Sequence, residues 1–328
     1  MTPPPTGEKM DDLSLPSEIP VDEDYGLSRD LDYDDGSAYS IASTKYNFTW
    51  ENGRLYHDYK AGHPFPYDER SQENEEVLHE MMLYIQDDKY FAAPVDGDQL
   101  KNVLDLGCGL GLWSEGVADR YPECNVLGVD SAPRNDPIIP NCQFELADVT
   151  EEWLFVNPST KFDLVHIRSL FASLKLEDWL PLYKQCLDNM ESGAWIEQIE
   201  VEIKVYCDDD TRKPDGELER LAEMTQVMSS THGAYFQIAE NMSTMMRDAG
   251  FTDVREAKYK LPVGWWSADP KYKEIGKFFE RFYKTGLQGW LMHIWTKSMG
   301  FTPEAVNEAC LKAFAEIDSR KHHYYFQL

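Results

Sequence analysis

The chain has few basic residues and no long hydrophobic run. Its 328 residues include 31 Lys and Arg against 59 Asp and Glu, which gives a formal net charge of −28. A surface this acidic repels phosphate groups, so direct binding to nucleic acid or to an anionic membrane is disfavoured. No apolar run approaches the length of a membrane-spanning helix. We therefore expect neither nucleic acid nor a membrane as a partner.

The six cysteines form no CxxC motif and no Cys/His cluster, so the common zinc-site patterns are absent and no metal ligand set is expected. Cysteines scattered in this way are typical of buried thiols in a reducing compartment. The N-terminus, MTPPPTGEKM, also lacks the apolar core of a signal peptide. We expect a cytoplasmic protein, with a nuclear location as the alternative.

Four regions differ in composition. Residues 1–40 carry eleven acidic and two basic residues and few large apolar side chains, which predicts a disordered acidic tail. The alternative for this tail is an arm that binds a protein partner. Residues 41–100 are expected to form an N-terminal helical lid segment, with a helix over about 69–86. Residues 101–262 are expected to form the core, and residues 263–328 a helical cap with a final strand.

The core region alternates between strand-like and helix-like patterns. Strands are expected at 103–106, 125–129, 142–145, 162–166 and 194–199, and helices at 112–120 and 178–190. A further helix at 238–249 and a strand at 253–261 follow them. Such alternation implies a mostly parallel sheet covered by helices on both faces. The expected fold class is therefore α/β and Rossmann-like.

The segment Val103–Trp113, VLDLGCGLGLW, carries the clearest chemical signal. Asp105 is followed by glycines at alternate positions, namely Gly107, Gly109 and Gly111. Without a Cβ atom, backbone N–H groups can approach a ligand closely. A dinucleotide fingerprint would need a glycine where Leu112 stands. The pattern DxGxGxG instead resembles the first motif of class I S-adenosylmethionine (SAM)-dependent methyltransferases.

Acidic residues follow the next two strands. Asp130 ends the strand NVLGVD, just before Ser131, where a carboxylate can accept both hydroxyls of a ribose; a helix cap or a solvated loop acid is the alternative. Asp148 lies where class I methyltransferases use an acid to accept from the adenine amino group, while the N–H of the next residue, Val149, donates to the ring. A simple turn aspartate is the alternative. Trp153 is placed to stack on adenine or to pack in the core.

The fourth strand, FDLVHIR, places His166 and Arg168 at its carboxyl end. Ligands of open α/β sheets collect at this edge, so both side chains are expected to face the methyl group or the substrate. An imidazole ordinarily titrates near physiological pH, which makes His166 a candidate general base; a core histidine is the alternative. Arg168 suits an anionic substrate, and a structural ion pair is its alternative.

Together these motifs resemble fungal class I methyltransferases of the LaeA-like family, the secondary-metabolism regulator type. The resemblance runs from about Tyr46 to the C-terminus. It is carried by YNFTWENGRLYHDY (46–59), VLDLGCGLGLW (103–113), NCQFELADVTEEW (141–153) and FDLVHIR (162–168). It implies a seven-stranded sheet, SAM as cofactor and S-adenosylhomocysteine as product. The chain departs from the family's basic C-terminal tail, because it stops at HHYYFQL.

The resemblance also implies roles for individual residues. Cys108 fills the family's position between the first two glycines of the cofactor turn. The segment with Arg54, Tyr56 and His57 is expected to fold over the cofactor. Arg54 or Tyr56 would then hold the SAM carboxylate, and His57 would be a second candidate base across the cleft. For Arg54, a salt-bridge partner is the alternative.

The predicted cap is rich in aromatic residues, which bear on the substrate. They are Tyr259, Trp265, Trp266, Tyr272, Phe278, Phe279, Phe282, Tyr283, Trp290, His293 and Trp295. Many must pack together, but an aromatic-lined pocket above SAM would suit a planar or hydrophobic small molecule. The methionines Met242, Met245 and Met246 are further candidates for its wall, or pack their helix.

Methyl transfer from a sulfonium needs alignment and a dry site, and a base only where the acceptor must lose a proton. The sequence thus predicts a SAM-dependent methyltransferase that acts on an oxygen of a small secondary metabolite. Two alternatives remain open. One is a regulatory methyltransferase-like protein that works through protein partners. The other is a SAM-binding protein that catalyses a reaction other than methyl transfer.

Overall fold

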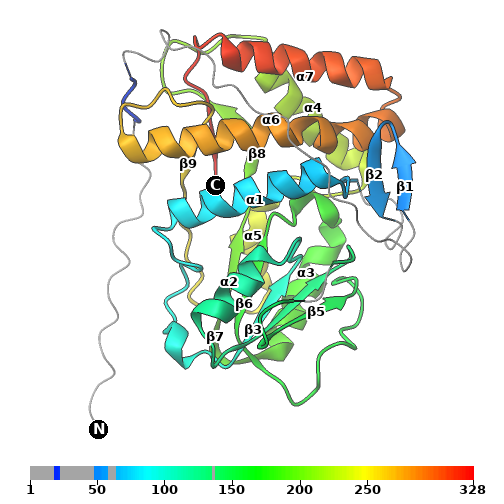
Figure 1. Cartoon of the computed structure of the whole chain (residues 1–328), viewed down its shortest axis with the longest axis vertical. Helices are drawn as coiled ribbons and strands as arrows, with labels where there is room; N and C mark the ends of the chain where they lie inside the picture. Colours follow the sequence, from blue (N-terminus) through cyan, green and yellow to red (C-terminus); the bar gives the residue numbers. More distant parts are fainter. Residues whose placement is uncertain (1–17, 23–47, 58–63, 135–136) are drawn as a thin grey trace.

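In this computed structural model the described residues are 18–22, 48–57, 64–134 and 137–328. A parallel sheet with its flanking helices forms the lower part of the molecule, and a layer of helices forms the upper part (Figure 1). Helix α1 (Glu69–Ile85) lies between the two. None of the helices in the described ranges is long and apolar enough to cross a membrane.

The central sheet contains five parallel strands. Their order is β5 (Cys142–Leu146), β4 (Asn125–Asp130), β3 (Asn102–Leu106), β6 (Phe162–Arg168) and β7 (Met190–Ile199). Helix α2 (Leu112–Arg120) covers one face, and α3 (Leu176–Asn189) and α5 (Ile238–Ala249) cover the other. Alternate strand residues enter these two cores because side chains alternate across a sheet. The predicted α/β fold with a parallel sheet is confirmed.

The seven-stranded sheet expected from the resemblance is not seen among the described residues. Three short strands form a separate antiparallel sheet instead, in the order β8 (Glu202–Tyr206), β10 (Tyr325–Gln327) and β9 (Lys260–Pro262). Strand β8 directly follows β7 in the chain, but it pairs with β10. The strand expected at 253–261 forms only at its end, in β9. The central sheet therefore ends at β7.

The upper layer consists of α4 (Glu217–His232), α6 (Pro270–Ser298) and α7 (Pro303–Asp318). Helix α6 begins at a strong cap, because the Asp269 side chain accepts from the backbone N–H groups of Lys271 and Tyr272 and proline occupies the first turn. One hydrophobic cluster joins α6 and α7 with α1 and α4. The helices expected as a cap thus share their core with α1.

The segment expected to be a helical lid also contains a hairpin. Strands β1 (Phe48–Glu51) and β2 (Arg54–His57) pair around Asn52 and Gly53, which have φ of 51° and 77°. An Asn-Gly pair favours this tight turn because both residues tolerate positive φ. The helical prediction is correct for α1 and wrong for the hairpin. Residues 41–47 and 58–63 lie outside the described residues.

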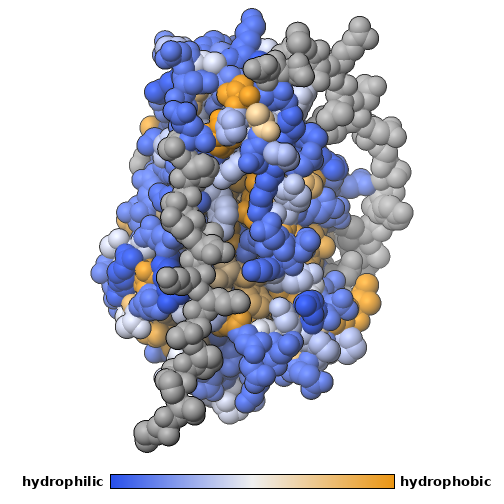
Figure 2. Space-filling view, turned by 90° about the vertical axis from the view of Figure 1, so that its left-hand side faces the viewer, coloured by the Kyte–Doolittle hydropathy of each residue, from blue (hydrophilic) through white to orange (hydrophobic). Residues whose placement is uncertain are grey.

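Part of the predicted acidic tail packs on the cap. Ile19 is buried with Trp266 and Tyr325, and Val21 bridges to Ser267. The rest of the predicted tail, 1–17 and 23–40, lies outside the described residues. Hydrophilic side chains cover most of the face drawn in Figure 2, as expected for so acidic a chain, with small hydrophobic groups between them.

Candidate active site

The glycine turn after β3 has a backbone that suits glycine. Gly107, Gly109 and Gly111 have φ of 72°, 53° and 81°, and the N–H groups of Gly107 and Cys108 both donate to the carbonyl of Val129. A Cβ atom on Gly107 would lie 2.7 Å from a methyl carbon of Leu170. The turn therefore needs glycine for its backbone angles and for close approach.

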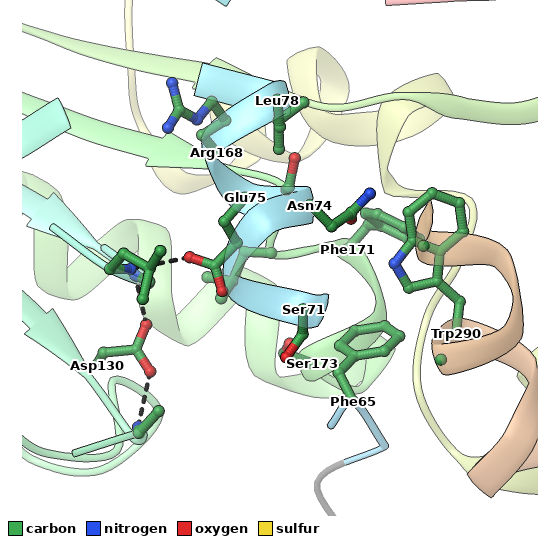
Figure 3. Close-up of a pocket in the computed structure, with 18 of the residues that line it drawn as sticks. Phe65, Ser71, Asn74, Glu75, Leu78, Asp130, Arg168, Phe171, Ser173 and Trp290 are labelled. Carbon is green, nitrogen blue, oxygen red and sulfur yellow. Dashed lines mark hydrogen bonds between the residues drawn. The ribbon is translucent and has the colours of Figure 1, made fainter. Parts of the chain in front are cut away.

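A cavity of about 270 Å³ begins at this turn and extends beneath α1 to α6 (Figure 3). Ten of the predicted site residues line it: Arg54, His57, Gly107, Cys108, Gly109, Asp130, Ser131, Asp148, Val149 and Arg168. Five predicted residues do not line it: Tyr56, Asp105, Gly111, Trp153 and His166. The cavity thus joins residues from the hairpin, the glycine turn and the carboxyl ends of three strands.

The two acids that follow β4 and β5 both lie at this carboxyl edge. Asp130 accepts from the N–H of Gly109 at 2.8 Å through Oδ2 and from that of Ala132 at 2.7 Å through Oδ1. Asp148 accepts from the N–H and the hydroxyl of Thr150. These bonds fix the orientation of both carboxylates toward the cavity wall.

Glu75 of α1 also lines the cavity, although it belongs to none of the sequence motifs. Its Oε2 atom accepts from the N–H of Leu110 at 2.8 Å, so carboxylates of Glu75 and Asp130 meet consecutive backbone groups of the turn (Figure 3). Burial, with the nearby charge of Asp130, raises the pKa of Glu75 to about 7, against the effect of the Leu110 bond. A signal was present, because Glu75 shares a helix face with Leu78 and Met82.

Arg168 ends β6 and lines the cavity. Burial lowers the pKa of its guanidinium, while the nearby carboxylates of Asp105, Glu75 and Glu197 act in the opposite direction. A second arginine, Arg134, donates to the carbonyl of Gly109. Arg168 is therefore a buried cationic group of the cavity with several carboxylates near it.

The prediction of His166 as a base that faces the substrate is not supported by its position. The side chain is buried, with 1% exposure, and its ring stacks on Trp113 at 3.8 Å. Its Nδ1 atom lies 2.9 Å from Asp105, whose other oxygen accepts from Ser114. His166 is on the same face of β6 as Arg168, but it lies two residues before the end of the strand, where Trp113 of α2 covers it and separates it from the cavity.

Three further residues that were predicted to bind the cofactor lie outside the cavity. Trp153 packs in the core with its indole N–H donating to Val149, so it is not placed to stack on adenine. Gly111 begins α2 beside Phe144 instead of lining the cavity. Tyr56 is buried against His293, and burial raises its pKa to about 12. Its β2 neighbours Arg54 and His57 line the cavity instead.

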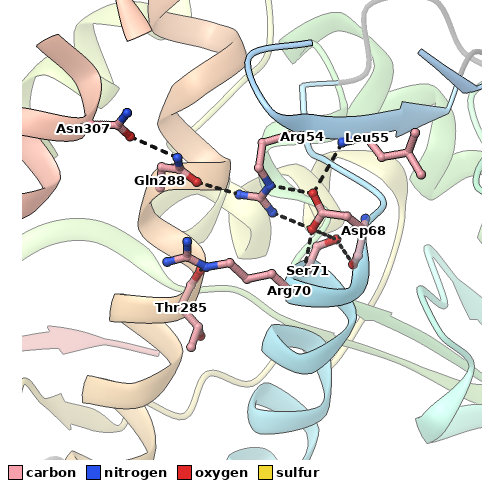
Figure 4. Close-up of polar contacts among 8 residues, drawn as sticks. All are labelled: Arg54, Leu55, Asp68, Arg70, Ser71, Thr285, Gln288 and Asn307. Carbon is pink, nitrogen blue, oxygen red and sulfur yellow. Dashed lines mark hydrogen bonds and ion pairs between the residues drawn. The ribbon is translucent and has the colours of Figure 1, made fainter. Parts of the chain in front are cut away.

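Arg54 is held in a polar junction (Figure 4). Its Nε and Nη2 atoms donate to both oxygens of Asp68, at 2.5 and 2.8 Å, and its Nη1 atom donates to Gln288. Asp68 is also the N-cap of α1, where it accepts from the N–H of Ser71. This bidentate pair ties the hairpin to α1 and α6. The alternative of an ion pair therefore describes Arg54 better than the role of binding the SAM carboxylate.

The far end of the cavity is aromatic. Four of the predicted cap aromatics line it: Phe279, Phe282, Tyr283 and Trp290, all on α6. Asn74 of α1 secures this wall, because its amide donates to the carbonyl of Phe282 and to the hydroxyl of Thr285. The methionines lie elsewhere: Met242 and Met246 line a second cavity, and Met245 packs against the core. The site thus combines a polar glycine end with an apolar aromatic end.

Comparison with known proteins shows which family the chain resembles. A family model described as a methyltransferase domain matches residues 75–256. Methyltransferase pytC of Aspergillus terreus is 32% identical over 294 residues, which cover 89% of this chain and 88% of pytC. Secondary metabolism regulator LAE1 of Cochliobolus heterostrophus is 32% identical over 250 residues, or 73% of this chain and 78% of LAE1.

A further relative carries a different description. Protein-methionine methyltransferase laeA of Emericella nidulans is 28% identical over 295 residues, which cover 88% of this chain and 76% of laeA. The family model covers more than half of the chain, and pytC matches nearly all of it. The chain therefore belongs to the SAM-dependent methyltransferases, in the fungal LaeA-like family.

Proposed function

We propose that this protein methylates an oxygen of a small aromatic or hydrophobic secondary metabolite. The observation that carries the proposal is the single cavity that runs from the glycine turn to the aromatic wall of α6. A planar apolar molecule is favoured there, because stacking on aromatic rings and removal from water both stabilise it. Its relative pytC bears the description methyltransferase, which supports an enzymatic role.

The residues around the glycine turn fit SAM. Gly107 and Gly109 line the cavity and carry no Cβ atom, so the cofactor could approach the backbone of the turn closely. Asp130 would accept from the ribose hydroxyls, and Asp148 with the N–H of Val149 would meet the adenine. When bound, SAM supplies an electrophilic methyl group on a sulfonium, so the leaving group is already activated.

The chain's own residues then align and deprotonate the acceptor. The aromatic side chains of α6 hold the acceptor ring and exclude water. Glu75 would take the proton of the acceptor hydroxyl at its carboxylate. A base that titrates near the working pH is effective, and the pKa of Glu75 is about 7. His57 is the other cavity residue that could accept this proton.

The proposal can be tested with fractions of one extract. A cell extract is separated by ultrafiltration into small molecules and proteins, and each fraction is incubated with the purified chain and methyl-labelled SAM. Label in a small molecule, together with release of S-adenosylhomocysteine, is expected. Label confined to the protein fraction would overturn the proposal and favour a protein substrate, as the description of laeA suggests.

A variant pair makes this assay specific. Trp290 lines the aromatic wall, whereas Trp50 is 71% exposed on the hairpin. Trp290→Ala should reduce labelling of the small molecule, and Trp50→Ala should not. If both variants methylate the acceptor as well as the wild type does, the aromatic wall is not part of the substrate site.

A further inference from the structure

Trp290 of α6 contributes both apolar surface and a polar group to the aromatic end of the cavity. Its ring centroid lies 4.9 Å from that of Phe282 and 6.0 Å from that of Tyr283, so the three rings form one wall. In Figure 3 the indole nitrogen of Trp290 is turned toward the interior of the cavity. The wall therefore presents an N–H donor to any molecule that packs against it.

This indole N–H has no hydrogen-bond partner among the described residues. Three other indoles donate to backbone carbonyls, namely Trp113, Trp153 and Trp266. Trp179 and Trp295 have no partner in the described part of the chain, but both are sealed in the core. Trp290 differs from all of these, because its ring is only partly buried and lines a cavity. A ligand that covers this N–H binds well only if it supplies an acceptor, since a covered donor without a partner weakens binding.

Other polar side chains at this wall already donate their protons inside the protein. Ser71 and Thr285 donate to backbone carbonyls through their hydroxyl groups. Asn74 uses its amide N–H groups on the carbonyl of Phe282 and on the hydroxyl of Thr285. The N–H of Trp290 is thus available for a ligand, whereas these three side chains are committed to the protein.

Gly286 provides the space for this orientation of the indole. Gly286 and Trp290 are four residues apart on α6, and helical side chains lean toward the N-terminus, so the indole lies over the glycine. A Cβ atom on Gly286 would lie 2.5 and 2.8 Å from the Cε2 and Cη2 carbons of Trp290, and closer still to Cζ2. These separations are far below carbon–carbon contact distance, so a side chain at this position would force the ring to turn.

The backbone of α6 around Gly286 is held from α1. Arg70 donates to the carbonyls of the two residues that precede Gly286, at 3.2 and 2.9 Å. Asn74 donates to the carbonyl of Phe282 at 2.6 Å, one turn earlier. Because these bonds anchor the helix, a clash at Gly286 would be relieved by the Trp290 ring and not by the backbone.

We propose that Trp290 recognises a carbonyl oxygen of the acceptor, at the end remote from the hydroxyl that is methylated, and that Gly286 orients the indole for this contact. The inference rests on the proposed function, because it places the acceptor along the cavity with its hydroxyl toward Glu75. The substrate class that follows is a planar hydroxyaromatic molecule with a ketone, quinone or lactone carbonyl. Trp290 is then a specificity-determining residue, and Gly286 is a positioning residue.

Two probes of similar shape separate the hydrogen bond from apolar contact. Both 7-hydroxycoumarin and 2-naphthol are planar bicyclic molecules with one hydroxyl, and the coumarin alone has a carbonyl at the opposite end. Calorimetric titration of each into the full chain, saturated with S-adenosylhomocysteine, measures binding without turnover. The wild type should bind the coumarin about fivefold more tightly, as expected for one hydrogen bond. Equal affinity for the two probes, or no binding of either, would overturn the proposal.

Replacement of the indole identifies the group responsible. Trp290→Phe keeps an aromatic ring without an N–H, so the ratio of the two affinities should fall to about one. Trp50→Phe is the matched control, because Trp50 is 71% exposed on the hairpin, and it should keep the wild-type ratio. If Trp290→Phe weakens both probes and leaves the ratio unchanged, Trp290 contributes packing alone and the proposal is wrong.

Variants of Gly286 test how the indole is oriented. Gly286→Ala should also abolish the preference for the coumarin, because the added methyl group turns the ring. It should not destabilise α6 intrinsically, since alanine favours a helix more than glycine does, and melting curves establish that each variant is folded. The double variant Gly286→Ala/Trp290→Phe should resemble Trp290→Phe, because the two changes act on one contact. A wild-type ratio in Gly286→Ala would contradict the role of Gly286.

The binding ratio can be judged separately from the reaction. If extracts contain no small molecule that the chain methylates, yet the coumarin preference is present and depends on Trp290, the proposed function fails and the recognition by Trp290 stands. If a small molecule is methylated but the wild type binds both probes equally, the proposed function stands and this inference fails.

Discussion

The Nδ1 atom of His166 lies 2.9 Å from Oδ1 of Asp105, inside the strand pair β3–β6. The other oxygen of Asp105 accepts from Ser114 of α2 at 2.6 Å, and the His166 ring stacks on Trp113. Burial opposes ionisation of Asp105, but these hydrogen bonds outweigh it and hold the pKa of this carboxyl below its usual range. The acid that introduces the glycine turn thus stabilises the junction of β3, β6 and α2.

The variant His166→Ala should lose stability more than catalysis. It leaves the Asp105 carboxylate buried without this partner, at a cost of roughly 3 kcal/mol in the free energy of unfolding. Urea denaturation measures this loss, and the folded enzyme should keep its SAM affinity and most of its kcat. A variant with normal stability and no turnover would instead restore the catalytic role of His166.

The pair of Asp105 and His166 also predicts how the free energy of unfolding depends on pH. Because the folded pKa of Asp105 lies below its unfolded value, its contribution is complete above about pH 4 and disappears as the pH falls through the folded pKa. Asp105→Asn should therefore reduce the free energy of unfolding at pH 7. The difference from wild type should shrink toward pH 3. A difference that does not change over this range would contradict the assignment.

Glu75→Gln should separate proton transfer from cofactor binding. Wild-type kcat should rise with pH through about 7, as Glu75 ionises, whereas the variant should have a kcat at least tenfold lower and no rise in this range. The dissociation constant for SAM should change by no more than a few fold, because a glutamine oxygen still accepts from Leu110. A kcat close to wild type combined with greatly weakened SAM binding would assign Glu75 to the cofactor instead.

Glu75 should also make stability fall as the pH rises. Its folded pKa, about 7, lies above its unfolded value, so the unfolded chain loses the proton first and the folded state becomes less favourable between about pH 4.5 and 7. Glu75→Gln should remove this penalty and raise the free energy of unfolding at pH 8 by roughly 3 kcal/mol. Little difference is expected at pH 4, and equal differences at both pH values would contradict the raised pKa.

Asp130→Ala should weaken SAM binding at least a hundredfold, because it removes a charged acceptor for the ribose. Gly109→Val should have a similar effect, since a Cβ atom at φ of 53° is strained and would lie 2.3 Å from the Glu75 carboxylate. Isothermal titration calorimetry measures both, with the solvent-facing Asp119→Ala on α2 as the control. Normal affinity for SAM in both variants would show that the cofactor does not bind at this turn.

Arg54→Lys should destabilise the fold by about 1–2 kcal/mol, because lysine cannot form the bidentate contact with Asp68. Its dissociation constant for SAM should stay within a few fold of wild type. Thermal unfolding and calorimetry give the two values. Unchanged stability together with a large loss of SAM affinity would return Arg54 to the role of binding the SAM carboxylate.

Local patterns were sufficient for the parts of the site that are continuous in the chain. The apolar strand and the alternating glycines of Val103–Gly111 predict a tight turn, because only glycine tolerates its angles and close contacts. Strand endings likewise placed Asp130 and Asp148 at one sheet edge, since parallel strands all point in the same direction. These elements depend on neighbours within a few residues, and the structure has them where they were expected.

Local sequence patterns could not predict side-chain burial or contacts between residues that are distant in the chain. His166 and Arg168 are two residues apart on one strand, yet one is sealed in the core and the other lines the cavity. Arg54 has Asp68 and Gln288 as partners, and no local pattern reports a contact across more than two hundred positions. The spacing of Glu75 from Leu78 and Met82 places it on the buried face of α1, but its contact with the glycine turn forms only after the chain has folded.

The amino-acid sequence was enough to establish the α/β fold and the class of enzyme, because both depend on periodicity and on a short motif with strict backbone demands. Packing established which charged side chains remain at the site. It buried the Asp105–His166 pair, brought Glu75 onto the turn and set the aromatic wall of α6 opposite it. The end of the parallel sheet at β7 also depended on packing, because pairing between distant strands is decided by the competition among all of them.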